Sequence, residues 1–166
     1  MTDTEPSEEN SQRPLTITKK HLLLVEGSDD WHFFTALLRH LEIDEVQIIR
    51  CGSRDEIRAR ISALRVAPTF ESVERIGVVR DADENATGAF DSVRGALSAA
   101  SLPIPQSEMD IVTATQPPAV SVFIMPGNRQ PGMLETLLCQ SFANPVIDGC
   151  IDRFLDCAPG ENGEWL

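Results

Sequence analysis

The sequence predicts an α/β fold in which helices flank a mostly parallel sheet of about four strands. Short branched-aliphatic runs alternate with segments whose apolar residues recur every three or four positions, and glycines or prolines separate them. Runs that are apolar throughout are typical of strands buried on both faces, as in parallel sheets. The chain has 166 residues, 42% of them hydrophobic, which suits a single domain of ordinary size.

The first two strands are each followed by a helix. Residues 21–25 form the first predicted strand, and the next helix begins after Gly27, where Ser28 or Asp29 can cap it. This helix has one apolar face, which we expect to be buried and which carries Trp31, Phe34, Leu38 and Leu41. Residues 46–50 form the second strand. Ser53 and Glu56 then predict a capping box at the start of a second helix, which ends before Pro68.

Two more strands are predicted in the second half of the chain. Residues 75–79 form a strand that leads into a helix carrying Phe90, Val93 and Leu97. Residues 120–125 form a fourth strand, followed by a loop at 126–132 and a helix through residues 133–142. Between these units, residues 111–112 could add a short strand. A last helix carries Ile147, Cys150, Ile151, Phe154 and Leu155.

The ends of the chain differ in composition from its middle. Residues 1–14 are polar and acidic and predict a disordered leader, residues 15–158 a single domain, and residues 159–166 an irregular end. The sequence has no apolar stretch near the roughly 18 residues that span a bilayer, and no secretory signal. We therefore expect a cytoplasmic protein without a membrane partner. Its four cysteines lack zinc-like spacing, so we expect them to be reduced.

The net charge of −12 argues against tight binding of nucleic acid by this chain alone, because such affinity comes from Lys and Arg. Two alternatives remain for the arginines around the second strand and helix. They could form a basic face, or they could lie on a solvated helix flank and pair with nearby acids, which is the more common arrangement. These arginines are Arg50, Arg54, Arg58, Arg60 and Arg65.

Acidic residues follow the first and third strands. Glu26 comes directly after the first strand, and Asp81 and Asp83 come at the end of the third. The carboxyl ends of parallel strands meet at one sheet edge, where open α/β sheets place their sites. If Asp-x-Asp is extended, both side chains point to the same side. Three acids at one edge repel one another unless a cation lies between them, so this pattern favours Mg²⁺ or Mn²⁺ and phosphate chemistry.

Each candidate residue also has a simpler explanation. Glu26 could gain only from the positive end of a helix dipole, and Asp81 and Asp83 could be solvated turn residues. Glu135 could be an additional metal ligand or a first-turn helix acid, and Asp30 a substrate contact or a helix-capping residue. Two arginines flank the proposed site and could contact phosphate or only offset carboxylates. They are Arg80 and Arg129.

The order and spacing of these residues resemble the Toprim domain. Its pattern is an apolar strand that ends in glutamate and glycine, as in residues 22–27, followed by a strand that ends in Asp-x-Asp, as in residues 78–83. Residues 24–30, 80–83 and 123–135 further resemble a group of small stand-alone Toprim-like proteins, except that Gly127 stands where an acid is usual. Members of that group usually continue with further helical residues, so the resemblance hints that this chain is truncated after residue 166. The resemblance implies a Rossmann-like three-layer sandwich, with Glu26 as general acid or base and both aspartates as ligands of Mg²⁺ or Mn²⁺.

Two functions follow from this resemblance. One is Mg²⁺-dependent phosphodiester chemistry on nucleic acid, as in a small nuclease. Tyrosine-linked strand passage is excluded for this chain, because it has no Tyr. The other is a non-catalytic module that assembles with a protein partner such as a nucleic-acid-processing ATPase, or with copies of itself. The metal hypothesis requires Glu26 to lie near Asp81 and Asp83, with no Lys or Arg head group in that corner.

Overall fold

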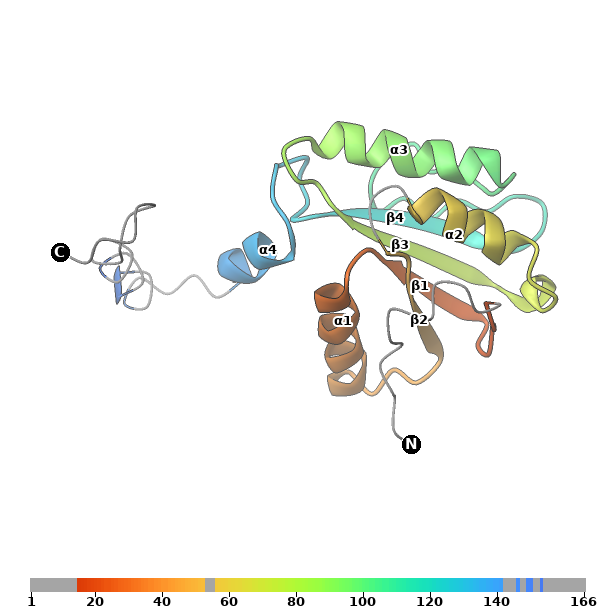
Figure 1. The fold of residues 1–166 in the computed structure, drawn as a ribbon, viewed down its shortest axis with the longest axis horizontal. Coiled ribbons are helices and arrows are strands. Elements are labelled where there is room, and N and C mark those ends of the chain that lie inside the picture. The colour runs from red at the N-terminus through yellow and green to blue at the C-terminus, as the bar shows by residue number, and fades with distance from the viewer. Residues whose placement is uncertain (1–14, 53–55, 142–145, 147–148, 151–152, 154–166) are drawn as a thin grey trace.

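The computed structural model describes residues 15–52, 56–141, 146, 149–150 and 153. Its centre is an all-parallel sheet of four strands in the order β2-β1-β3-β4. Figure 1 shows this sheet with helices on both sides. The strands are β1 (His21–Val25), β2 (Val46–Arg50), β3 (Arg75–Asp81) and β4 (Ala119–Met125). The predicted strands are therefore confirmed, with β3 two residues longer at its carboxyl end than expected.

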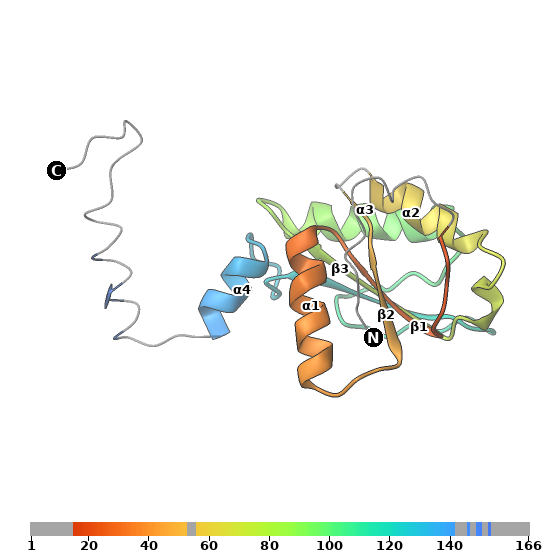
Figure 2. The ribbon, with the colours of Figure 1, turned by 60° about the horizontal axis from the view of Figure 1, so that its bottom comes forward.

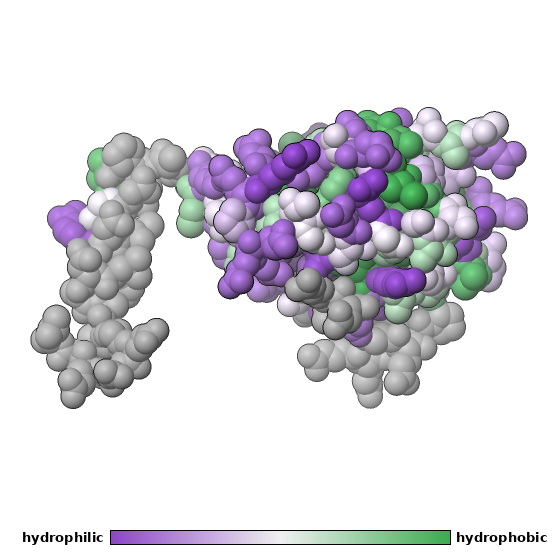
Figure 3. Space-filling view, turned by 90° about the horizontal axis from the view of Figure 1, so that it is seen from above, coloured by the Kyte–Doolittle hydropathy of each residue, from purple (hydrophilic) through white to green (hydrophobic). Residues whose placement is uncertain are grey.

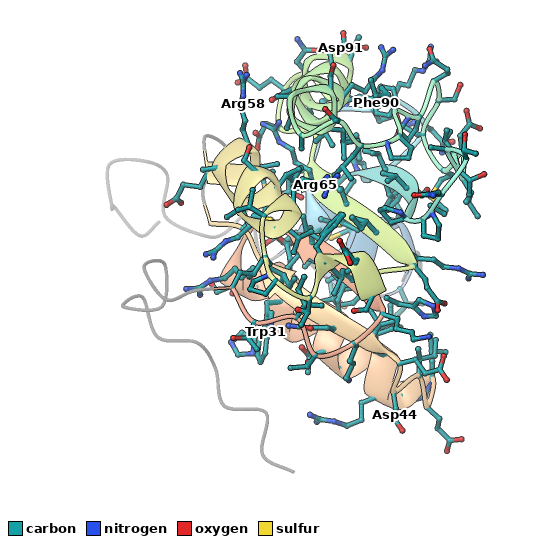
Figure 4. The ribbon with its side chains drawn as sticks, turned by 90° about the vertical axis from the view of Figure 1, so that its right-hand side faces the viewer. Trp31, Asp44, Arg58, Arg65, Phe90 and Asp91 are labelled. Carbon is teal, nitrogen blue, oxygen red and sulfur yellow. The ribbon has the colours of Figure 1, made fainter. Side chains whose placement is uncertain are left out.

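The helices form two layers, one on each face of the sheet. Helices α2 (Glu56–Arg65) and α3 (Ala86–Ala99) cover one face, whereas α1 (Ser28–His40) and α4 (Leu134–Ser141) pack on the other. The views in Figures 1 and 2 separate these layers, and Figure 4 shows Arg58 and Asp91 on the opposite side of the sheet from Trp31 and Asp44. The fold is thus the predicted Rossmann-like three-layer α/β sandwich.

The face under α2 and α3 carries the larger core. Alternate strand residues such as Leu24, Val78 and Val122 meet Ile61 of α2 and Leu97 of α3, and all five are at most 1% exposed. A 3-10 helix at Phe70–Ser72 adds its buried Phe70 to the same cluster. The outer surface of this layer is mostly hydrophilic, as Figure 3 shows, which is expected of helices with one buried face.

The face under α1 and α4 is covered less completely. Val25, Val79, Met125 and Leu134 are buried there, whereas Trp31 and other apolar residues that pack on them are only partly buried. The predicted apolar face of the first helix is therefore only partly buried. Leu41 lies beyond the end of α1 with 53% of its surface exposed.

Several other predictions differ from the structure or lie outside its described part. The short strand expected at residues 111–112 is a single antiparallel bridge between Val112 and Val120, and the Met109 N–H donates to the Val122 carbonyl nearby. Helix α1 begins after Gly27, without a side-chain cap from Ser28 or Asp29. The acidic leader at 1–14, the cap at Ser53 and most of the last helix lie outside the described residues.

The order of the strands defines a switch point between β1 and β3. The chain moves from β1 to β2 in one direction and then crosses back to β3 and β4 on the other side of β1. In open α/β sheets, the crevice at the carboxyl ends of such strands is where ligands bind. Within the described residues, no helix is both long and apolar enough to cross a membrane.

Candidate functional site

A cavity of about 620 Å³ lies at this switch point. The carboxyl ends of β1, β2 and β3 and the first turns of α1 and α4 surround it, so residues far apart in the sequence meet there. Its charged lining comprises Glu26, Asp29, Asp30, Arg50, Glu56, Asp81 and Glu135. Glu26, Asp30, Asp81 and Glu135 were site candidates from the sequence, and the structure brings these four to one cavity.

Glu26 follows β1 and faces a buried arginine. The Arg80 Nε atom lies 3.4 Å from Glu26 Oε2, and the Arg80 side chain is only 1% exposed. Neither atom completes a hydrogen bond of good geometry, which leaves both buried and unsatisfied. Burial raises the pKa of Glu26 more strongly than the Arg80 charge lowers it. Contrary to the requirement stated from the sequence, an arginine head group thus occupies part of this corner.

Asp81 is the last residue of β3, and its surroundings differ from those of Glu26. Its Oδ1 accepts a hydrogen bond of 3.1 Å from the Leu134 backbone N–H at the start of α4. Burial, followed by the nearby charges of Asp30 and Glu26, raises the pKa of Asp81 to about 7. A carboxylate held among other carboxylates in this way is stabilised by any cation that binds next to it.

Asp30 serves the backbone of its own helix. Its Oδ2 accepts a 2.8 Å hydrogen bond from the Gly27 N–H, and the residue is 5% exposed. Burial is the main cause of its raised pKa, and the charge of Glu135 adds to it. Glu135 itself lies exposed in the first turn of α4. The simpler explanations for both residues, as helix-start acids, therefore apply alongside their place in the cavity.

Asp83 does not line the cavity. The strand ends at Asp81, and Asp83 has a φ of 51°, so Asp-x-Asp is not extended and its side chains do not alternate as expected. The backbone of Asp83 instead exchanges hydrogen bonds with Gly132, and its side chain is exposed. Its charge still raises the pKa of Glu26 and Asp81. The prediction that Asp81 and Asp83 share one side is wrong.

The two arginine candidates take different positions. The buried guanidinium of Arg80 lies against Glu26, and its Nη1 donates to the Ala89 carbonyl of α3 at 3.4 Å. This placement favours the alternative that Arg80 offsets a carboxylate over the alternative that it contacts phosphate. Arg129 lies exposed in the loop after β4, outside the residues that line the cavity.

Three charged residues of the cavity, Asp29, Arg50 and Glu56, were not site candidates from the sequence, and Arg50 is the cation among them. It ends β2, its Cα pairs in register with that of Val25, and it is the one Lys or Arg among the described lining residues. From the sequence, it was one of five arginines that could form a basic face or lie on a solvated helix flank. Arg50 ends β2, which lies next to β1, the strand that precedes Glu26. This position distinguished it from the other four arginines, since sites in open α/β sheets lie at the carboxyl ends of the strands.

The cavity offers carboxylates to a metal ion, but within the described part of the chain it does not enclose one with protein ligands alone. Among the described residues, no group of three or more His, Cys, Asp or Glu side chains is close enough to enclose an ion. Mg²⁺ commonly uses only one or two carboxylates and completes its shell with water and phosphate oxygens. Asp81, together with Glu26 or Asp30, offers hard oxygen donors of this kind and a crowding of negative charge that a cation relieves.

Comparisons with known proteins identify a family. No curated protein and no solved structure matched the chain. A family model described as "Protein of unknown function (DUF3226)" matches residues 20–159, which include every strand and helix of the sandwich. The chain belongs to the DUF3226 family.

Proposed function

We propose that this protein binds Mg²⁺ or Mn²⁺ at the acidic side of the cavity and acts on phosphodiester bonds of nucleic acid, as a small Toprim-like nuclease in the cytoplasm. One observation carries the proposal. Asp81 lies beside Glu26 and Asp30 at the switch point of the sheet, and burial and mutual repulsion raise its pKa to about 7. Perturbed acids in a cleft at this position are typical of functional sites.

The residues of the cavity would divide the work. Asp81 would hold the cation together with Glu26 or Asp30, since these carboxylates lie within electrostatic reach of one another. A bound divalent ion would polarise a phosphoryl oxygen. Glu26 is suited to exchange a proton, because its burial moves its pKa upward toward neutral pH. Arg80 would act as a positioning residue that holds the Glu26 carboxylate from the side of α3.

A second function is a non-catalytic module that assembles with a nucleic-acid-processing ATPase or another partner. One specific observation favours it. The Arg80 guanidinium already offsets the charge of Glu26, which reduces the need of this corner for a metal ion. The net charge of −12 further suits a basic partner.

Titration calorimetry with Mn²⁺ at pH 8 tests the proposal. Wild type should bind Mn²⁺, and Asp81→Asn should lose at least tenfold in affinity, which is the loss expected when one of few ligands is removed. Asp83→Asn is the matched control, because it removes the same charge two residues away and outside the cavity. Equal losses in both variants, or no binding by wild type at millimolar Mn²⁺, would refute the site.

Cleavage assays separate the two functions. With Mn²⁺ present, single-stranded DNA, duplex DNA and structured RNA should include at least one substrate that wild type cuts. Glu26→Gln should abolish this cleavage if Glu26 exchanges a proton in the reaction. Mn²⁺ binding without turnover on any of these substrates would favour the assembly module.

A further inference from the structure

Arg50 is the one Lys or Arg among the described residues that line the cavity. Arg80, a second arginine at this edge of the sheet, is already paired with Glu26. The side chain of Arg50 has no hydrogen bond or ion pair with any described residue, although six carboxylates line the same cavity. Its guanidinium donors are therefore available to a ligand.

The position of Arg50 complements the acidic side of the cavity. Arg50 ends β2 beside Val25 at the same carboxyl edge as Glu26, and the first turns of α1 and α4 bound the space between them. The cavity thus has several carboxylates that together suit a cation, and one guanidinium that suits an anion. A phosphodiester bound to a metal ion needs both, because its two non-bridging oxygens carry negative charge that the ion alone neutralises only in part.

We infer that Arg50 is the substrate-binding residue that holds a phosphate of a nucleic-acid strand across the cavity from the acids at Asp81. The inference rests on the proposed function and adds a residue to it. A planar guanidinium can donate two parallel hydrogen bonds to one phosphate, which an ammonium cannot do. A volume of about 620 Å³ is within the range of sites that take a ligand of nucleotide size.

The test is a comparison of oligonucleotide binding among three variants. Fluorescence anisotropy would follow a labelled single strand of about 12 nucleotides, with Ca²⁺ in place of Mn²⁺ to allow binding without turnover, and again in EDTA at low salt. Arg50→Gln should weaken binding about tenfold in both conditions, which is the usual size of one charge-assisted contact, and Arg50→Lys should restore part of it. Arg58→Gln is the matched control, because Arg58 points outward from α2 (Figure 4).

Mn²⁺ calorimetry distinguishes a phosphate-binding role of Arg50 from a purely structural role. Arg50→Gln removes a positive charge beside the proposed cation site, so it should bind Mn²⁺ at least as tightly as wild type. Weaker oligonucleotide binding combined with unchanged or tighter Mn²⁺ binding supports the inference.

Other outcomes overturn specific parts of the proposal. Equal oligonucleotide affinities of Arg50→Gln and Arg58→Gln would overturn the role of Arg50 and leave the metal site standing. Loss of Mn²⁺ binding in Arg50→Gln would indicate that the substitution disrupts the structure around the cavity, and it would also overturn the role of Arg50. Failure of wild type to bind Mn²⁺, with oligonucleotide binding still dependent on Arg50, would refute the metal site alone. Failure of wild type to bind the strand in either condition would refute the role of Arg50, and Mn²⁺ calorimetry would still decide the metal site.

Discussion

Glu26 and Asp81 lie at the carboxyl ends of neighbouring parallel strands and line one cavity, yet their charges are balanced differently. The buried Arg80 guanidinium lies against Glu26 and also donates to the Ala89 carbonyl of α3. The partner of Asp81 is the Leu134 N–H at the start of α4, and its charged neighbours are acids. One edge thus supplies a compensated acid and an uncompensated one. The compensating arginine is bonded to the well-packed layer, whereas the partner of Asp81 belongs to the partly covered layer.

Removal of the compensating cation should have the largest effect. Arg80→Met leaves Glu26 half-buried without its counter-charge, and we expect the free energy of unfolding to fall by about 3 to 5 kcal/mol, as when one partner of a buried pair is lost. Urea denaturation would measure it. The double variant Arg80→Met/Glu26→Gln should recover part of the loss. A change within about 1 kcal/mol for Arg80→Met would mean that the pair is energetically unimportant.

The same truncation on the two faces should have unequal effects. Leu97→Ala on α3 removes a side chain that is 0% exposed and should lower the free energy of unfolding by about 3 kcal/mol. Leu138→Ala on α4 removes a partly buried side chain and should cost about 1 kcal/mol, because less area leaves water there. Both variants would be measured by chemical denaturation. Equal losses would mean that the α1 and α4 face is as tightly packed as the other.

Neutralisation of Asp81 should stabilise the protein above neutral pH. Its pKa is raised to about 7 in the folded state, whereas about 4 is usual for an unfolded chain. Between about pH 4 and pH 7 the folded state keeps the Asp81 proton that the unfolded state has already lost. The stabilisation from this proton is therefore complete below pH 4 and is lost as the pH rises through 7. Asp81→Asn should therefore be more stable than wild type at pH 8, by about 1 to 2 kcal/mol after allowance for solvent screening.

The measurement for Asp81 is the difference in unfolding free energy between wild type and variant at pH 4 and pH 8. The difference should be near zero at pH 4 and should increase until about pH 7. Asp83→Asn, with its exposed side chain, should show a much smaller pH dependence. A constant difference for Asp81→Asn across this range would contradict a raised pKa of Asp81 in the folded state.

Mn²⁺ should produce the smallest stability change. At about five times its dissociation constant, an ion that binds only the folded state adds about 1 kcal/mol, or about 2 to 4 °C in the melting temperature of a domain of this size. Calorimetric melting at pH 8 should show this shift in wild type and in Asp83→Asn, and should not show it in Asp81→Asn. A shift of equal size in all three proteins would point to binding elsewhere.

The sequence predicted the architecture because its strands are nearly continuous apolar runs and its helices show clear spacing. It also predicted that Glu26 and Asp81 would meet, since both follow strands that neighbour each other in the sheet. It could not predict the direction of Asp83, because a positive φ at a non-glycine residue leaves no pattern in the surrounding residues.

The role of Arg80 depended on where β3 ends. With a strand ending at residue 79, Arg80 is a loop residue free to reach a ligand. With the strand continuing to Asp81, the alternation of side chains directs Arg80 to the face of Ile76 and Val78, under α3. A difference of two residues in the end of β3 therefore decides whether Arg80 is exposed or buried. The spacing of apolar residues does not locate the end of a strand to within two residues.

The segment beside β4 bears on how this protein can associate with others. The Met109 N–H and the reciprocal bonds of Val112 with Val120 occupy part of the outer rim of β4, and the Lys19 ammonium donates to the Val46 carbonyl of β2 at the opposite rim. Lysines and short covering segments at such rims oppose intermolecular β-sheet extension and aggregation. A companion molecule would thus dock more readily through side chains on the helices than by adding a strand.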